Sequence, residues 1–136
     1  DVLERMLALN LRPGHALARA ALPHMIAAGG GAIVEIASAA AIGPQPGQAS
    51  YGASKAAALS LFQSLAEELR ARGVRVNVVL PGTMDTEANR RAMPDADRSG
   101  WVSTEDVARA VLFLCSDDAR AVSGAAIPVR GGGRAG

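Results

Sequence analysis

Three short runs rich in β-branched residues alternate with helical segments, and this alternation limits the chain to few folds. The runs cover 32–37 (AIVEIA), 74–80 (VRVNVVL) and 125–129 (AAIPV). Such apolar runs are typical of strands buried on both faces of a parallel sheet. The order helix, strand, helix, strand, helix, strand predicts an α/β fold with crossover helices, a doubly wound parallel sheet.

Helix periodicity fills the segments between these runs. Apolar residues at i, i+3 and i+4 spacing predict helices over 1–28, 51–72 and 105–116. Pro13-Gly14 should interrupt the first helix, Gly73 should end the second, and Ser103 or Thr104 should cap the third. The stretch 83–102 is predicted to be a long polar loop, which favours a binding lid. Three strands make a narrow sheet, so the chain is predicted to be one domain, 1–136, cut from a larger fold.

The only tyrosine and the only lysine, Tyr51 and Lys55, lie four residues apart in the second helix. At this spacing their side chains share a face, with Cβ atoms roughly 5–6 Å apart. A nearby ammonium favours the phenolate and so suits a tyrosine to general acid/base catalysis. Ser38 and Pro81-Gly82-Thr83 directly follow two predicted strands, at the edge where open parallel sheets bind ligands.

The surrounding motifs resemble those of the short-chain dehydrogenase/reductase family. The segment YGASKAAALSL (51–61) is similar to the family's active-site helix, and AIVEIASAAAIG (32–43) to its strand and catalytic serine. PGTMDT (81–86) is similar to the family's cofactor loop, MLALNL (6–11) to the segment that carries its asparagine, and SGAAIPVRGG (123–132) to its last strand. The resemblance spans essentially the whole chain and implies the C-terminal half of a Rossmann-like fold, about three strands with flanking helices.

The family resemblance also implies roles for individual residues. Tyr51 would be the acid/base, Lys55 would lower its pKa and bind the nicotinamide ribose, and Ser38 would donate to the substrate oxygen. Asn10 would hold a water in a proton relay from Lys55. Cofactor contacts would come from Tyr51, Lys55, Pro81, Gly82, Thr83, the Met84 backbone and Thr86, with NAD or NADP as the cofactor. The expected activity is hydride transfer between the nicotinamide and a small-molecule carbonyl or alcohol.

Two departures from the family pattern qualify these expectations. The sequence contains no GxxxGxG cofactor turn, because Gly29-Gly30-Gly31 follows a helix and Gly131-Gly132-Gly133 follows the last strand. The chain is therefore expected to lack the N-terminal dinucleotide-binding half, as a partial sequence or a truncated product, and to be inactive alone. Glu35 stands where the family usually has a neutral residue. A charge in a buried strand needs a partner, unless a strand edge faces solvent there.

The segment 81–101 (PGTMDTEANRRAMPDADRSGW) resembles the corresponding loop of dihydropteridine reductases, which makes pterin reduction an alternative. That group typically lacks the catalytic serine, so Ser38 favours carbonyl or alcohol chemistry. Met93 and Trp101 could line a substrate pocket or simply pack in the loop. An alternative of another class is a non-catalytic interaction module, since family members commonly dimerise through the helices that 1–28 and 51–72 resemble. The full-length protein is expected to be a homodimer or homotetramer.

Composition excludes several other classes of function. A net charge of +1 and 3% aromatic residues argue against nucleic-acid binding. No apolar stretch reaches membrane-spanning length, and no signal peptide is visible, so a cytoplasmic protein is expected. Cys115 is the single cysteine and is predicted to be a buried small hydrophobe. His15 and His24 lack further ligands at metal spacing, so no metal site is predicted.

Overall fold

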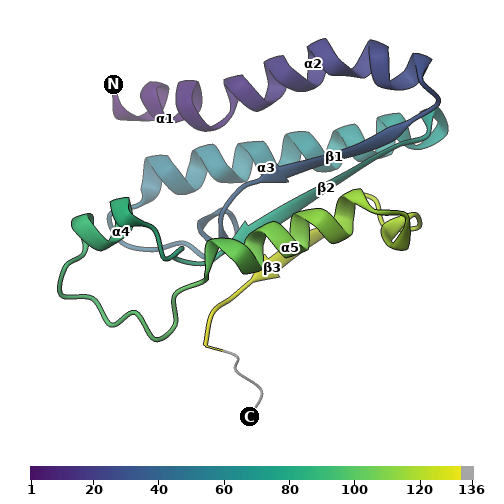
Figure 1. The fold of residues 1–136 in the computed structure, drawn as a ribbon. Helices are drawn as coiled ribbons and strands as arrows, with labels where there is room; N and C mark the ends of the chain where they lie inside the picture. The colour runs from purple at the N-terminus through teal and green to yellow at the C-terminus, as the bar shows by residue number, and fades with distance from the viewer. Residues whose placement is uncertain (133–136) are drawn as a thin grey trace.

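The computed structural model describes residues 1–132 and has three layers (Figure 1). The sheet contains β1 (Gly31–Ile36), β2 (Val74–Pro81) and β3 (Ala126–Val129), and single 3-10 turns follow β1, the long central helix and the last helix. The α-helices are α1 (Val2–Asn10), α2 (Arg12–Ala27), α3 (Ala49–Leu69), α4 (Glu87–Ala92) and α5 (Thr104–Cys115). The 3-10 turns are η1 (Ala39–Ala41), η2 (Arg70–Arg72) and η3 (Asp117–Ala119).

All three strands are parallel, in the order β1-β2-β3. Ile33 pairs with Val76, and Val79 pairs with Ile127, so β2 lies in the middle of the sheet. Every residue of β2 except the half-buried Arg75 is buried, whereas β1 is only partly covered. The predicted α/β fold of three parallel strands with flanking helices is confirmed.

The two faces of the sheet bury separate apolar clusters. On one face, α2 and α3 pack against the sheet around Phe62, Val76 and Val78. On the other face, α5 packs through Val107 and Leu114 against Val79. Residues of β1 alternate between the two clusters, with Ile33 on the α2/α3 face and Val34 on the α5 face. Glu35 therefore points to the α2/α3 face, because side chains two apart in a strand share a face.

The first predicted helix is divided, but at Leu11 rather than at Pro13-Gly14. Leu11 has φ −116° and ψ −54° and separates α1 from α2. Pro13 lies in the first turn of α2, where its missing N–H removes no helical hydrogen bond. The interruption consequently comes before the proline, and it turns α1 against α3.

The predicted loop 83–102 is not entirely loop, because it contains α4. Thr86 begins this helix, and its Oγ1 accepts a hydrogen bond from the Asn89 N–H at 3.2 Å. A bridge between Met84 and Val102 closes the base of the segment. The sequence analysis missed this six-residue helix because the segment is polar throughout. Its N-cap, Thr86, is one of the residue types that commonly begin helices.

The prediction that Cys115 is buried is wrong. Cys115 is the last residue of α5 and is exposed, whereas Leu114 beside it is fully buried. The apolar run 111–115 belongs to an amphipathic helix, so neighbouring residues face opposite sides.

Asn77 is a buried polar residue in the middle of β2, with 1% of its surface exposed. Its Nδ2 donates to the Val122 carbonyl at 2.9 Å, and its Oδ1 accepts from the Ala125 N–H at 3.0 Å. One amide thus fixes the segment that leads into β3.

Two turns at the opposite end of the sheet from the carboxyl ends of the strands touch through glycines. Gly30 has φ +130°, and a Cβ added there would collide with the Gly73 carbonyl oxygen. The same oxygen accepts a hydrogen bond from the Gly31 N–H at 3.1 Å. Gly73 has φ +72° at the end of η2, so both turns depend on glycine.

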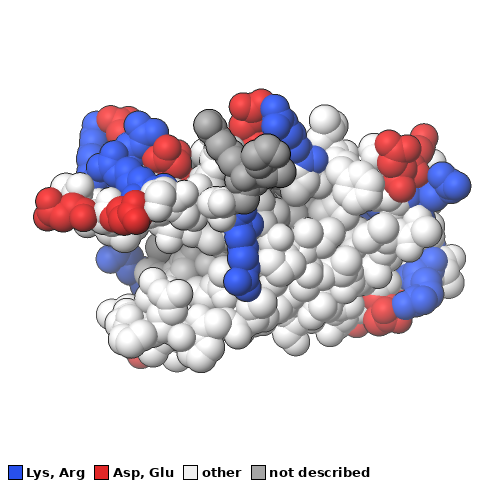
Figure 2. Space-filling model, turned by 90° about the horizontal axis from the view of Figure 1, so that it is seen from below, with Lys and Arg blue, Asp and Glu red and all other residues white. Residues whose placement is uncertain are grey.

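Most charged side chains lie in small groups around the periphery of the face shown in Figure 2. At α4, the ion pairs Arg90–Asp85 and Arg91–Glu87 join side chains of opposite sign. Most of these groups contain both signs, and a single basic side chain lies alone near the middle, so this face carries no large field of one sign.

Candidate active site

A cavity of about 350 Å³ lies at the carboxyl ends of β1 and β2. It is lined by the segment after β1, the first turn of α3, the segment after β2, and α4. The sequence-predicted residues that line it are Ser38, Tyr51, Pro81, Gly82, Thr83, Met84 and Thr86. Parallel strands bring these distant segments to one edge, as expected for an open α/β sheet.

Tyr51 and Lys55 lie on α3 beside this edge. The Lys55 Nζ is 6.0 Å from the centroid of the Tyr51 ring. It also donates a hydrogen bond to the Ile36 carbonyl oxygen at 3.2 Å. The ammonium is thereby held between the aromatic ring and the end of β1, two residues before Ser38.

Ser38 follows β1 with an extended backbone, φ −168° and ψ 154°. Its Oγ accepts a hydrogen bond from the Ala40 N–H at 3.1 Å, which starts η1. A hydroxyl group can accept and donate at the same time, so the Ser38 O–H can still donate into the cavity. Just before it, the Ala37 N–H donates to the Val79 carbonyl at 2.9 Å and holds this turn on β2.

Asn10 is the last residue of α1 and contacts α3. Its Nδ2 donates to the Ser54 Oγ at 3.0 Å and approaches the Met6 sulfur at 3.8 Å. The Ser54 hydroxyl in turn donates to the Tyr51 carbonyl at 2.7 Å, and Ser54 is fully buried. Asn10 is thus joined to the Tyr51 backbone through Ser54, a residue that the sequence analysis did not single out. A serine three residues after Tyr51 was the available signal.

The segment after β2 is held from two sides. The Gly82 N–H donates to the Val129 carbonyl at 3.0 Å, and the Thr83 carbonyl accepts from the Val102 N–H at 2.8 Å. The Asp85 N–H donates to the Val102 carbonyl at 2.7 Å. This part of the cavity wall is therefore fixed mainly by main-chain hydrogen bonds, to which the Asn89 side chain adds a bond to the Met84 carbonyl at 2.8 Å.

Thr86 lines the cavity, but its Oγ1 also serves as the cap of α4. Beside it, hydrogen bonding from the Arg90 guanidinium lowers the pKa of Asp85. The Arg90–Asp85 pair joins the start of α4 to its own last turn at 2.6 Å.

Of the two residues predicted either to line a pocket or to pack in the loop, only Met93 lines the cavity. Trp101 packs under the Arg98 guanidinium, 5.6 Å from its ring, and is not part of the lining. Gln45 and Gln48 line the cavity as well, and the sequence analysis missed both. Their place in the glycine- and proline-rich segment before Tyr51 was the only signal.

Glu35 lies half-buried on β1, one residue before Ile36, whose carbonyl binds Lys55. Burial raises the pKa of Glu35, and the positive charge of Lys55 acts in the opposite direction. Lys55 therefore acts on Glu35 only through space and is not a direct partner of its carboxylate. The two charges are not in direct contact, because they form no ion pair within 4.0 Å.

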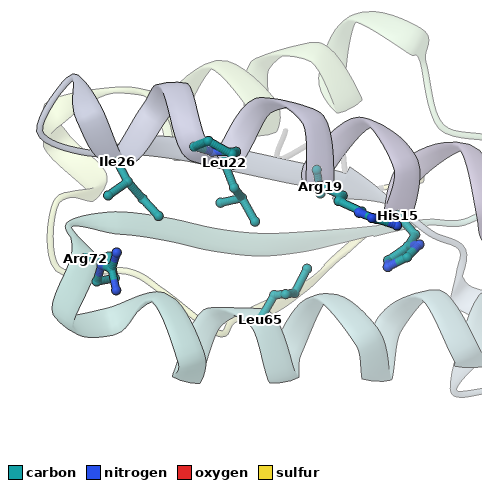
Figure 3. Close-up of a pocket in the computed structure, with 8 residues that line it drawn as sticks. His15, Arg19, Leu22, Ile26, Leu65 and Arg72 are labelled. Carbon is teal, nitrogen blue, oxygen red and sulfur yellow. The ribbon is translucent and has the colours of Figure 1, made fainter.

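A groove of about 530 Å³ lies away from this cavity, between α2 and α3. Figure 3 shows Leu22 and Ile26 on α2 on one side of it and Leu65 on α3 on the other, with His15, Arg19 and Arg72 at its borders. Its walls hold none of the residues of the Tyr51–Ser38 cavity.

Within residues 1–132, no group of three or more histidine, cysteine, aspartate or glutamate side chains could hold a metal ion. None of the helices in this described part is both long and apolar enough to cross a membrane.

Comparison with known proteins places this geometry among reductases and dehydrogenases. A family model described as enoyl-(acyl carrier protein) reductase matches residues 1–133. The human protein "Dehydrogenase/reductase SDR family member 4" is 34% identical over 142 residues, which cover 97% of this chain and 51% of that protein. The chain spans about half the length of the curated relatives it matches.

Solved structures agree with the sequence comparison. A short-chain type dehydrogenase/reductase from Mycobacterium ulcerans superposes with a TM-score of 0.89 at 34% identity, covering 96% of this chain and 51% of that one. A 7α-hydroxysteroid dehydrogenase complexed with NADH and 7-oxoglycochenodeoxycholic acid gives a TM-score of 0.82 at 33% identity, covering 96% of this chain and 55% of that one.

Proposed function

The chain belongs to the short-chain dehydrogenase/reductase family, and on that premise we propose that it is the catalytic half of an NAD(P)-dependent oxidoreductase. The reaction would interconvert a small carbonyl compound and its alcohol. The observation that carries the proposal is the shared cavity of Ser38 and Tyr51, with the Lys55 ammonium against the Tyr51 ring.

In the reductive direction, Tyr51 gives its hydroxyl proton to the substrate oxygen as that oxygen becomes negative. Lys55 favours the phenolate that remains, because opposite charges attract strongly in a partly buried site. Ser38 donates its free O–H to the same oxygen and stabilises the charge that develops there. In the oxidative direction, the Tyr51 phenolate takes the alcohol proton.

The residues present fit the nicotinamide end of a dinucleotide. When bound, that cofactor supplies or takes up the hydride. The lining offers the Tyr51 hydroxyl and the backbone of Pro81 to Met84, a wall already fixed by β3 and by Val102. Lys55 would bind the ribose, and Thr86 would approach a phosphate. Solved relatives are complexed with NADH or have NADP bound, which supports a nicotinamide dinucleotide, NAD or NADP, as the cofactor.

Carbonyl chemistry is preferred over pterin reduction because Ser38 lies on the cavity, where a carbonyl oxygen needs a donor. The likeness of the loop 81–101 to dihydropteridine reductases stays a prediction. The alternative of a non-catalytic interaction module is less supported, since such a module has no use for Ser38 and Tyr51 in one cavity.

The proposal has two further parts. The domain 1–136 works with a dinucleotide-binding half that its own sequence does not contain, so the chain alone is expected to be inactive. The whole protein forms a homodimer or homotetramer, and the apolar groove between α2 and α3 supports an interface there (Figure 3).

The test replaces Tyr51 by phenylalanine in the complete polypeptide that carries this sequence. Loss of the proton donor should lower kcat for NAD(P)H-dependent reduction of a ketone panel by about 10³-fold. Cofactor binding, followed by nicotinamide fluorescence, should be largely kept. Ser38→Ala should also lower kcat, whereas Ser60→Ala, on the exposed side of α3, should not. If Tyr51→Phe reduces ketones as fast as the parent, the proposed mechanism is wrong.

The residue range 1–136 by itself gives a second test. Its binding of NADH and NADPH should be weak in a fluorescence titration. Tight binding would contradict the expectation that this half needs another to hold the cofactor.

A further inference from the structure

Three side-chain amides lie on the wall of the candidate active site, and the proton transfer described above uses none of them. Gln45 and Gln48 come from the segment between η1 and α3, and Asn89 comes from α4. Figure 1 shows α4 at the end of the sheet where α3 begins, so the amides reach the cavity from two separate segments. A carboxamide offers both hydrogen-bond donors and an acceptor. The three side chains therefore suit a ligand that also donates and accepts, as an alcohol does.

The amide of Asn89 is oriented by the main chain. Its Nδ2 donates to the Met84 carbonyl oxygen at 2.8 Å, and its backbone N–H donates to the Thr86 Oγ1 at 3.2 Å. A carbonyl oxygen only accepts hydrogen bonds, so the nitrogen arm of the amide must face Met84. The Oδ1 lies on the other arm, as an acceptor for a donor group of a ligand. An alcohol hydroxyl is such a donor, whereas an alkyl chain would cover the acceptor without pairing it.

Gln45 and Gln48 place two exposed amides on the same cavity. The Gln48 N–H donates to the Gln45 carbonyl at 3.2 Å, which joins the two backbones in one turn. The Gln48 carbonyl accepts from the Gly52 N–H at 2.7 Å in the first turn of α3, one residue after Tyr51. The position of Gln48 is therefore tied to the helical turn that carries Tyr51, and a substrate bound at Tyr51 meets this amide in the same cavity.

No charged side chain lines this cavity within the part of the chain that the structure describes. Lys55 donates to the Ile36 carbonyl, and Arg90 on α4 is paired with Asp85 at 2.6 Å. A carboxylate or phosphate group on a substrate would lose water here without an ion-pair partner in the lining, which is costly. The lining therefore favours an uncharged substrate.

We propose that the substrate is an uncharged carbonyl compound that carries hydroxyl groups on the carbons beside the carbonyl. Asn89 accepts a hydrogen bond from one hydroxyl group, and Gln45 and Gln48 exchange hydrogen bonds with the others. Ser38 and Tyr51 hold the carbonyl oxygen. A few polar groups of this kind fix the orientation of a ligand in its pocket. This inference rests on the proposed function, because it names the substrate class of that same site.

The experiment measures kcat/KM for the NAD(P)H-dependent reduction of four ketones by the complete polypeptide. The compounds 2-butanone, 1-hydroxy-2-butanone, erythrulose and 2-oxobutanoate share a four-carbon skeleton with the carbonyl at carbon 2. They carry no hydroxyl group, one, three, or a carboxylate in place of the hydroxyl groups. One neutral hydrogen bond is worth about fivefold, so erythrulose should exceed 2-butanone by at least about tenfold. The charged 2-oxobutanoate should be a poorer substrate than erythrulose.

Gln48→Leu and Asn89→Leu separate recognition by the protein from the intrinsic reactivity of the ketones. Leucine is close in size to either amide and makes no hydrogen bonds through its side chain. Each variant should lower the ratio of kcat/KM for erythrulose to that for 2-butanone by about fivefold. Gln63→Leu is the matched control, because Gln63 lies on α3 outside the cavity, where its Nε2 donates to the Gly124 carbonyl. It should leave the ratio unchanged, and circular dichroism checks that every variant is folded.

The outcomes separate this inference from the proposed function. A parent that reduces no ketone with NADH or NADPH, or that is unaffected by Tyr51→Phe, would end the proposed function. An active parent that needs Tyr51 but prefers 2-butanone or 2-oxobutanoate to erythrulose would overturn the substrate class alone. An erythrulose to 2-butanone ratio that is unchanged in both Gln48→Leu and Asn89→Leu would do the same.

Discussion

Two polar side chains lie in adjacent strands of one sheet, and they are accommodated in opposite ways. Asn77 on β2 is almost completely buried, and both ends of its amide have a hydrogen-bond partner in the chain. Glu35 on β1 is half-buried, and its compensation is the charge of Lys55 at a distance. Asn77 connects structural elements, whereas Glu35 lies beside the candidate catalytic pair.

The comparison shows how a buried polar group can be assigned to structure or to function. A buried polar side chain that hydrogen-bonds only to main-chain groups stabilises the fold. Its removal should therefore lower the free energy of unfolding. A charged side chain with no such partners is costly to the fold, and removing it should relieve that cost. Stability measurements at the two positions should therefore change in opposite directions.

The largest effect is expected for Asn77→Ala, which leaves the Val122 carbonyl and the Ala125 N–H without their partner. Burying two unsatisfied backbone groups should lower the free energy of unfolding by about 3 kcal/mol. Urea denaturation of parent and variant measures this difference. Asn89→Ala, which removes a single half-buried hydrogen bond to the Met84 carbonyl, is the control and should cost clearly less. A loss below about 1 kcal/mol at position 77 would contradict the structural role of the amide.

A matched valine pair compares the apolar surroundings of the two strands. Val78→Ala on β2 removes a fully buried side chain and should cost about 2 kcal/mol. Val34→Ala on β1 removes the same two methyl groups from a half-covered position and should cost about half as much. Equal losses in urea denaturation would show that β1 is as well covered as β2 in the complete protein.

The smallest effect, and the one of opposite sign, is expected for Glu35→Gln. Burial raises the folded-state pKa of Glu35 above its unfolded value, so the folded state favours the protonated acid. The destabilisation is absent below the unfolded pKa and develops fully as the pH rises through the raised folded pKa. Since Glu35 is partly exposed, the variant should melt only about 2 °C higher at neutral pH. At about pH 3 this advantage should disappear, because glutamate is then almost fully protonated in both states. An advantage of equal size at both pH values would point to packing rather than charge.

Much of the fold could be predicted from sequence because its signals are local. The β-branched runs and the glycines at 29–31 and 73 placed all three strands within about one residue of their ends. The break in the first helix lies at Leu11, two residues before the predicted Pro13, because a proline is accommodated in the first turn of the helix that follows. The short helix α4 was missed because it has no apolar repeat of its own. The exposed Cys115 was missed because a run of five apolar residues does not reveal which of them a helix turns outward.

In the candidate site, too, residues in local sequence motifs were predicted, and residues placed by packing were not. Motifs located Ser38, Tyr51 and Lys55, and the parallel sheet brings the first two to one cavity. Ser54, Gln45 and Gln48 were not found, because their contacts come from the packing of α1 on α3 and from the path of the segment before Tyr51. The close approach of the Glu35 Oε2 to Gly14, 3.0 Å from the place of a Cβ there, joins residues 21 positions apart on different elements, which no spacing rule reveals.

The contact between Gly30 and Gly73 has a practical consequence for anyone who wishes to engineer this protein. The turns before β1 and before β2 occupy each other's space, so a residue added to one must be accommodated by the other. Affinity tags, reporter insertions and circular permutations should therefore avoid both turns. The exposed stretch around Asp95 and Gly100, where an added Cβ at Gly100 meets nothing within 4 Å, is the better place for such an insertion.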